Sequence, residues 1–292
     1  MSAGETGARP GLSCACHLSA TTASSRLIWQ PSCKDWFGWN VRVKRSTSLS
    51  LFGLLTIWPL TSATLPTATD YRQSGNDHLY NLEYDQAIVD YRKLIQQNSD
   101  DANAYNDLAG AQLYKELYRL GLLASSALGR DNHFTRDARP PADLRAEAQV
   151  RDTLDNGRLA AERLLIQNPR NELALFSLCT NYALRANYEF TLEKAWFAAL
   201  RSGSKARGYC EQVLKLNPKF IDAYLVLGAY EYVTGSLPLP VKLFAAIGGL
   251  HGSREKGIAY LSRVAQQGKC NRDGARVLLV VLYRREKRPL EG

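Results

Sequence analysis

Apolar residues recur at intervals of three and four along most of the chain after residue 68, which is the spacing of amphipathic α-helices. Three stretches repeat one order of polar and apolar positions: QQNSDDANAYNDL (96–108), IQNPRNELALFSL (166–178) and KLNPKFIDAYLVL (215–227). In each stretch, Asn followed by Ser or Pro comes after one amphipathic helix and shortly before the next. The pattern predicts an all-α chain in which helices are joined by similar short turns.

The segment 68–101 shows the internal spacing of this repeat best. Two small residues, Gly75 and Ala87, lie 12 positions apart, with Tyr71 before the first and Tyr91 after the second. The small residues allow two helices to approach closely, while the tyrosines fill the space between them. This arrangement resembles the tetratricopeptide repeat (TPR), a 34-residue helix–turn–helix unit with small and aromatic residues at such positions.

The resemblance implies an all-α fold, a right-handed α-solenoid over residues 64–292. Its helix–turn–helix units are expected near 68–101, 102–171, 172–220 and 221–271, with a partial unit at 272–292. The packing positions of these units are taken by aromatic, small and turn residues: Tyr71, Gly75, Ala87, Tyr91, Tyr105, Leu108, Pro169, Ala206, Pro218, Tyr224 and Gly228. The whole chain is similar to exported bacterial TPR-repeat proteins of unassigned function.

The later units are stretched between their two helices. The separations Ala109–Gly157, Cys179–Ala206 and Gly228–Gly257 are 48, 27 and 29 residues, where the first unit has 12. Because all three insertions fall between a first and a second helix, we expect them on one edge of the solenoid. A last helix, 273–285, matches a first helix without its partner. Either the chain is truncated there, which we favour, or a partner covers the exposed face.

Residues 41–63 have the parts of a secretory signal peptide. Basic residues within 42–45 precede the apolar run 49–60, and a small-x-Ala tripeptide ends at Ala63, after which we expect cleavage. The apolar run is shorter than the roughly 20 residues that span a bilayer, and an uncleaved inner-membrane anchor is the alternative. We therefore expect an exported, periplasmic protein. Residues 1–40 have no helical or strand period and are interpreted as an unstructured extension or a misassigned start.

Composition and charge limit the classes of protein. The 292 residues are 45% hydrophobic and 22% charged, which excludes a collagen-like, a wholly disordered or a multi-span membrane chain. The net charge of +9 is uneven, because residues 201–292 carry +9 and residues 64–200 carry −4. This basic third is either a solvated surface, which we favour, or a contact for an acidic partner or anionic lipid. It lacks interleaved aromatic residues, so no nucleic-acid partner is expected.

No catalytic or metal-binding motif stands out in the chain. GxSxG, CxxC, HExxH and GxxxxGK[ST] are absent, and Cys14-Ala15-Cys16-His17 lacks the second ligand pair of a zinc site. Three further cysteines, Cys179, Cys210 and Cys270, form an odd set. The first two fall on apolar helix faces, where a free cysteine is usually a small core residue. We expect no cofactor, no metal and no catalysis, and an enzyme with the insertions as an active-site cap is the least favoured alternative.

The resemblance also implies a concave groove, lined by the first helix of each unit, that grips a peptide of a protein partner. The corresponding positions are polar in the N-terminal half and largely apolar beyond: Arg72, Asn76, Tyr80, Asn103, Asn106, Tyr114, Phe176, Thr180, Leu225 and Tyr232. Family members that clamp a C-terminal carboxylate carry Lys, Arg and Asn there. In this chain the groove positions carry one of these residue types at only four places: Arg72, Asn76, Asn103 and Asn106.

The apolar insertion 237–250 (LPLPVKLFAAIGGL) is a second candidate surface. Its part 241–247 is either a short amphipathic helix that docks on the solenoid, which we favour, or a segment that enters a membrane interface. The expected function is a non-catalytic protein–protein interaction scaffold exported to the cell envelope. The alternative is an envelope assembly or transport accessory that contacts the membrane through 237–250.

Overall fold

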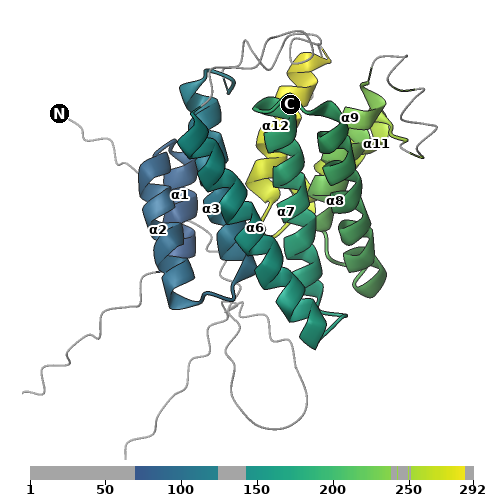
Figure 1. Cartoon of the computed structure of the whole chain (residues 1–292). Coiled ribbons are helices and arrows are strands. Elements are labelled where there is room, and N and C mark those ends of the chain that lie inside the picture. The colour runs from purple at the N-terminus through teal and green to yellow at the C-terminus, as the bar shows by residue number, and fades with distance from the viewer. Residues whose placement is uncertain (1–69, 124–142, 238–241, 243–248, 250, 287–292) are drawn as a thin grey trace, which may run out of the picture. The chain divides into compact units, whose positions relative to one another are not determined.

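A computed structural model describes residues 70–123, 143–237 and 251–286, together with Lys242 and Gly249. Within these residues the protein is all-helical and contains no strand, which confirms the predicted all-α class (Figure 1). The expected signal peptide, the extension before it and most of the 237–250 insertion lie outside the described residues.

The described helices form consecutive hairpins. Their bounds are α1 (Tyr71–Tyr80), α2 (Tyr84–Gln97), α3 (Ala102–Arg119), α6 (Leu144–Gln167), α7 (Glu172–Thr191), α8 (Trp196–Leu216), α9 (Ala223–Gly235), α11 (Arg254–Gln267) and α12 (Arg272–Arg285). The pairs α1/α2, α3/α6, α7/α8 and α9/α11 each pack together, and α2, α6, α8 and α11 each pack on the following helix. Two of the first helices, α3 and α9, also contact α7. Each hairpin therefore packs mainly on its neighbours in the chain.

The recurring asparagine of the sequence ends a helix and starts a turn. Asn98, Asn168 and Asn217 are the C-cap residues of α2, α6 and α8, with nearly equal φ angles of −147°, −142° and −138°. Each side-chain Oδ1 accepts a hydrogen bond from the backbone N–H two residues later, at 3.0–3.1 Å. An asparagine favours this local turn because its side chain competes for backbone groups that would otherwise extend the helix.

Small residues allow the hairpins to close. A Cβ atom added to Gly75 would lie 2.6 Å from Cε1 of Tyr91, so the tyrosine ring fills the space that glycine leaves. In the fourth hairpin, an added Cβ on Gly257 would lie 2.7 Å from the carbonyl oxygen of Gly228. Ala87 and Tyr91 are completely buried in the first hairpin. The close contacts thus fall on the small and aromatic positions of the sequence repeat.

Two cysteines form a disulfide within the third hairpin. Cys179 of α7 and Cys210 of α8 are bonded, with their Cα atoms 5.3 Å apart. Both are fully buried, as expected of core residues, but the interpretation as unpaired thiols is wrong. The sequence separation of 31 residues gave no sign that the two residues lie at the same level of adjacent helices.

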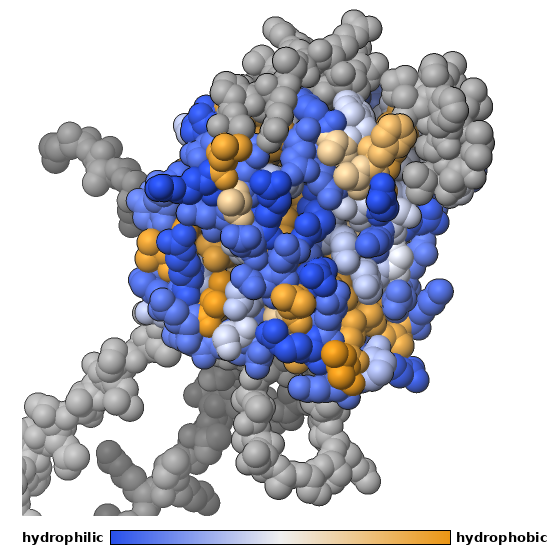
Figure 2. Space-filling model, viewed as in Figure 1, coloured by the Kyte–Doolittle hydropathy of each residue, from blue (hydrophilic) through white to orange (hydrophobic). Residues whose placement is uncertain are grey.

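None of the described helices is both long enough and apolar enough to cross a membrane. On the face drawn in Figure 2, hydrophobic residues are scattered among hydrophilic ones over the described surface. Single exposed apolar residues of this kind are common on protein surfaces.

Candidate binding surface

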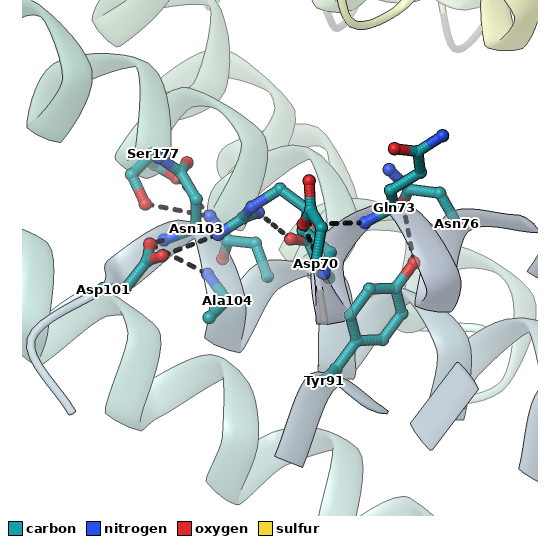
Figure 3. A network of polar contacts seen from close by, with 11 residues as sticks. Asp70, Gln73, Asn76, Tyr91, Asp101, Asn103, Ala104 and Ser177 are labelled. Carbon is teal, nitrogen blue, oxygen red and sulfur yellow. Dashed lines mark hydrogen bonds and ion pairs between the residues drawn. The ribbon is translucent and has the colours of Figure 1, made fainter. Parts of the chain in front are cut away.

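The predicted groove residues lie on α1, α3, α7 and α9, the first helices of the hairpins. The structure gathers part of the predicted polar set where α1 meets α3, and we call Arg72, Asn76, Tyr80 and Asn103 the α1–α3 surface. Figure 3 shows the polar contacts around it. Asp70 and Asp101 start the two helices, because their carboxylates accept hydrogen bonds from the first free N–H groups.

Arg72 is the centre of an ion-pair cluster. Its guanidinium donates to Oδ2 of Asp101 at 2.6 Å and also to Oδ2 of Asp107. Burial lowers the pKa of Arg72, but the charges of Asp107 and Asp101 outweigh it and leave the pKa above its usual value. Burial raises the pKa of Asp107 to about 6, against the opposing effect of Arg72 and with a further contribution from Asp101. The one cation of this cluster is thus already matched by two carboxyl groups.

Asn76 and Tyr80 differ in how open they are to a ligand. The Asn76 side chain accepts a hydrogen bond of 2.7 Å from the hydroxyl of Tyr91, which ties it to the interior of the first hairpin. Tyr80, at the end of α1, is 54% exposed. Asn103 is half-buried, and its backbone N–H donates to Asp101. Tyr80 and Asn103 are therefore the members of the α1–α3 surface best placed to meet a partner.

Asn106 is a core residue, and its assignment to the groove is wrong. The side chain is 2% exposed, and its Nδ2 donates to the carbonyl oxygen and the hydroxyl of Ser177 at 2.9 and 3.0 Å. Its Oδ1 accepts from Nδ2 of Asn181 at 2.9 Å, and Asn181 also donates to the Leu154 carbonyl. The asparagine therefore joins α3 to α7, because buried amide groups need partners.

The later groove candidates are mostly packed against neighbouring helices. Tyr232 is 2% exposed and donates its hydroxyl to Glu286 at 2.7 Å, so its assignment to the groove is also wrong. The ring of Phe176 lies 4.8 Å from that of Phe220. The remaining three, Tyr114, Thr180 and Leu225, are partly buried.

These placements argue against a carboxylate clamp on the α1–α3 surface. A clamp needs cations and amides that are free to bind an anion. Here Arg72 is paired with two carboxyl groups, Asn76 holds Tyr91, and Asn106 is buried. The residue types of a clamp are present, but the fold uses them to hold α1, α2, α3 and α7 together.

A cavity between α8, α9 and α11 was not predicted from the sequence. Its volume is about 310 Å³, and charged, aromatic and aliphatic residues line it: Arg207, Glu211, Leu214, Lys215, Tyr224, Leu227, Glu231, Lys256 and Tyr260. The only signal of it in the sequence is the basic character of the C-terminal third. A second hollow, of about 440 Å³ and mainly polar, lies beside α1 and includes Asp70, Asp77 and His78.

Acidic and metal-ligating side chains are dispersed over the described part of the chain. Among these residues, no group of three or more His, Cys, Asp or Glu is arranged to hold a metal ion. Glu231, the one buried carboxylate of the 310 Å³ cavity, pairs with Lys256 at 2.7 Å and accepts the N–H of Ser253. In comparisons with known proteins, neither a protein-family model nor a curated protein matches the chain.

Proposed function

We propose that this protein is a non-catalytic protein–protein interaction scaffold of the TPR type, exported to the cell envelope. The observation that carries the proposal is the order of packing, in which each helical hairpin rests mainly on its neighbours in the chain. Stacked hairpins of this kind form solenoids, whose long surfaces usually serve to bind other proteins. The repeated Asn turns and the small-residue contacts add support, since TPR units are helix–turn–helix units with small residues where their helices meet.

In this proposal the hairpins form a right-handed solenoid, and partners bind along its first helices. Buried polar contacts, in which Asn106 of α3 bonds Ser177 and Asn181 of α7, hold these helices in one arrangement. A rigid surface of this kind loses little conformational entropy when it binds a partner. Tyr80 and Asn103 present an aromatic ring and an amide there, and such groups are typical of protein interfaces.

The disulfide supports the export part of the proposal. Disulfides persist in oxidising compartments such as the bacterial periplasm and are rare in the cytosol. The bond between Cys179 and Cys210 therefore fits a chain that crosses the inner membrane, as the sequence of residues 41–63 predicts. Cleavage after Ala63 would release the protein into the periplasm, and the anchored form remains the alternative.

The scaffold proposal is tested by affinity capture of the full-length chain from its native host, with mass spectrometry to identify partners. The variant carries Tyr80→Ala and Asn103→Ala. The matched control carries Ile166→Ala, because Ile166 is 82% exposed on the second helix α6. A partner retained by the control and lost by the variant supports the proposal. A protein that captures nothing contradicts the scaffold proposal, and a variant that captures the same partners as the wild type contradicts partner binding at the α1–α3 surface.

One observation favours the membrane-contact alternative. Phe197, at the start of α8, is 80% exposed, and the neighbouring Trp196 ring meets Phe190 edge-on at 4.9 Å. Short connections join α7 to α8 and α8 to α9, so successive helices run in opposite directions. The start of α8 and the end of α9 at Gly235 therefore lie at the same end of the hairpins (Figure 1). Exposed aromatic residues near an apolar segment are typical of interfacial membrane contacts.

Co-sedimentation with phosphatidylglycerol vesicles tests this second candidate. The comparison is between the wild type and Phe197→Asp, with Ile166→Asp as the control for an equally exposed apolar residue elsewhere. Loss of vesicle binding in the first variant alone supports membrane contact. If the wild type stays in the supernatant, the second candidate is wrong.

A further inference from the structure

The 310 Å³ cavity between α8, α9 and α11, which we call the α8–α11 cleft, is lined in part by apolar side chains. The rings of Tyr224 and Tyr260 lie 4.9 Å apart with an interplanar angle of 60°. Leu214 and Leu227 line the cleft beside them. The two tyrosines and Leu214 offer a partner an apolar contact with little side-chain entropy to lose, whereas Leu227 is only 6% exposed.

The charges of the cleft are not balanced. Its two carboxylates are already paired, Glu211 with Arg207 and Glu231 with Lys256, each at 2.7 Å. Lys215 has no ion-pair partner in the part of the chain that the structure describes. Because both acids are paired, they repel an incoming anion weakly, and the remaining charge is positive.

A further cation borders the cleft beside its aromatic pair. The guanidinium carbon of Arg263 lies 4.6 Å from the centre of the Tyr224 ring. No carboxylate pairs with Arg263 within the described residues either. Stacking on the ring holds this arginine in place and leaves its N–H donors free to bind a carboxylate.

We infer that the α8–α11 cleft binds an acidic segment of a partner protein, with carboxylates on Lys215 and Arg263 and a neighbouring apolar side chain on Tyr224 and Tyr260. The inference rests on the proposed scaffold function, since the ligand is part of a protein. It assigns the partner chemistry to a surface distinct from the α1–α3 surface. It also gives the basic C-terminal third of the chain, of which the cleft is part, a specific role.

The probe is a fluorescein-labelled peptide of 12 residues that alternate Glu and Leu, titrated with the full-length protein and followed by fluorescence anisotropy. The matched probe replaces every Glu with Gln. We expect the acidic peptide to bind, the Gln peptide to bind at least tenfold more weakly, and the affinity to fall with added salt. Equal binding of the two peptides would overturn the inference.

The protein variant is Lys215→Glu with Arg263→Glu, and we expect it to weaken acidic-peptide binding at least tenfold. The control, Arg92→Glu with Arg170→Glu, makes the same change in net charge at two exposed arginines outside the cleft. An equal loss in the control means that only net charge matters, and it overturns the inference. The neutral variant Lys215→Gln with Arg263→Gln is expected to give an intermediate affinity, and it serves in place of the charge reversal if the latter does not fold.

Two further results separate this inference from its alternatives. N-acetylglutamate should compete at least a hundredfold less well than the peptide, and if it competes equally, the cleft is a site for small anions.

Affinity capture with the wild-type protein separates the inference from the scaffold proposal. If the peptide does not bind but the wild type captures partners, the inference fails and the scaffold proposal stands. If the peptide binds and the host yields no partner, the scaffold proposal fails.

Discussion

Removal of the Cys179–Cys210 disulfide should destabilise the protein by a predictable amount. The bond closes a loop across a sequence separation of 31 residues within the α7/α8 hairpin. In the chain-entropy description, a loop of this length contributes about 3.7 kcal/mol to the free energy of unfolding at 25 °C. This stabilisation arises because the bond restricts the unfolded chain, so it should disappear on reduction without any change of sequence.

The assay is urea unfolding followed by circular dichroism, with and without a phosphine reductant. With a slope of about 2 kcal/mol per M urea, reduction should lower the midpoint by roughly 2 M. The control variant, Cys179→Ala with Cys210→Ala, keeps every other cysteine and should not respond to the reductant. An equal response of wild type and variant would refute the reasoning, as would a wild-type midpoint that does not move.

The remaining predictions concern packing, buried polar contacts and pH. Ala87→Leu places a large side chain at a position with no exposure, so we expect a loss of about 1–3 kcal/mol in the free energy of unfolding. Val89→Leu, on the exposed face of the same helix, should cost much less; equal losses would contradict the close-packing argument. Asn106→Leu removes the buried hydrogen bonds of Asn106 to Ser177 and Asn181, at a cost of about 1–3 kcal/mol. Asn103→Leu is the control in the same urea titration, and a loss as large as that of Asn106→Leu would show that burial is not the cause. Because the pKa of Asp107 is raised from 3.8 to about 6, the folded state binds this proton more tightly than the unfolded state. Its contribution to stability is therefore present below about pH 4 and is lost as the pH rises through 6. Asp107→Asn should flatten the pH dependence of the midpoint in this window, and an unchanged slope would show that Asp107 is not its source.

Features that depend on neighbours in the chain could be predicted from the sequence. The turns at Asn98, Asn168 and Asn217 each require only a side chain and a backbone N–H two residues away. The contact of Gly75 with Tyr91 follows from the spacing of small and aromatic residues within one hairpin. Short-range patterns of this kind repeat along the chain, so each repeat supports the others.

Features that depend on contacts between hairpins could not be predicted. Asn106 is buried only because Ser177 and Asn181, more than 70 residues away, supply partners for its amide. Tyr232 is buried beside Glu286 for the same kind of reason, although its position in the repeat resembles that of a groove residue. The sequence therefore identified polar residues on the first helices but not which of them reach the surface.

A second limit concerns the pairing of charges and thiols, which depends on the level at which two helices meet. Arg72 meets Asp101 and Asp107 because α1 and α3 lie together, and the spacing of these residues in the sequence does not show this. The pairing of Cys179 with Cys210 likewise depends on the level at which α7 and α8 meet. The odd number of cysteines after residue 40 suggested unpaired thiols, but a count cannot show which residues face each other.

Site-specific photo-crosslinking in the native host tests the central claim, partner binding along the first helices, most directly. A photo-reactive benzoylphenylalanine replaces Tyr80 or Asn103 in two separate proteins, and Ile166 on α6 in a control. The account predicts that one and the same partner protein is crosslinked from positions 80 and 103 and not from 166. Crosslinks that are absent at all three positions, or equally strong at 166, would contradict it.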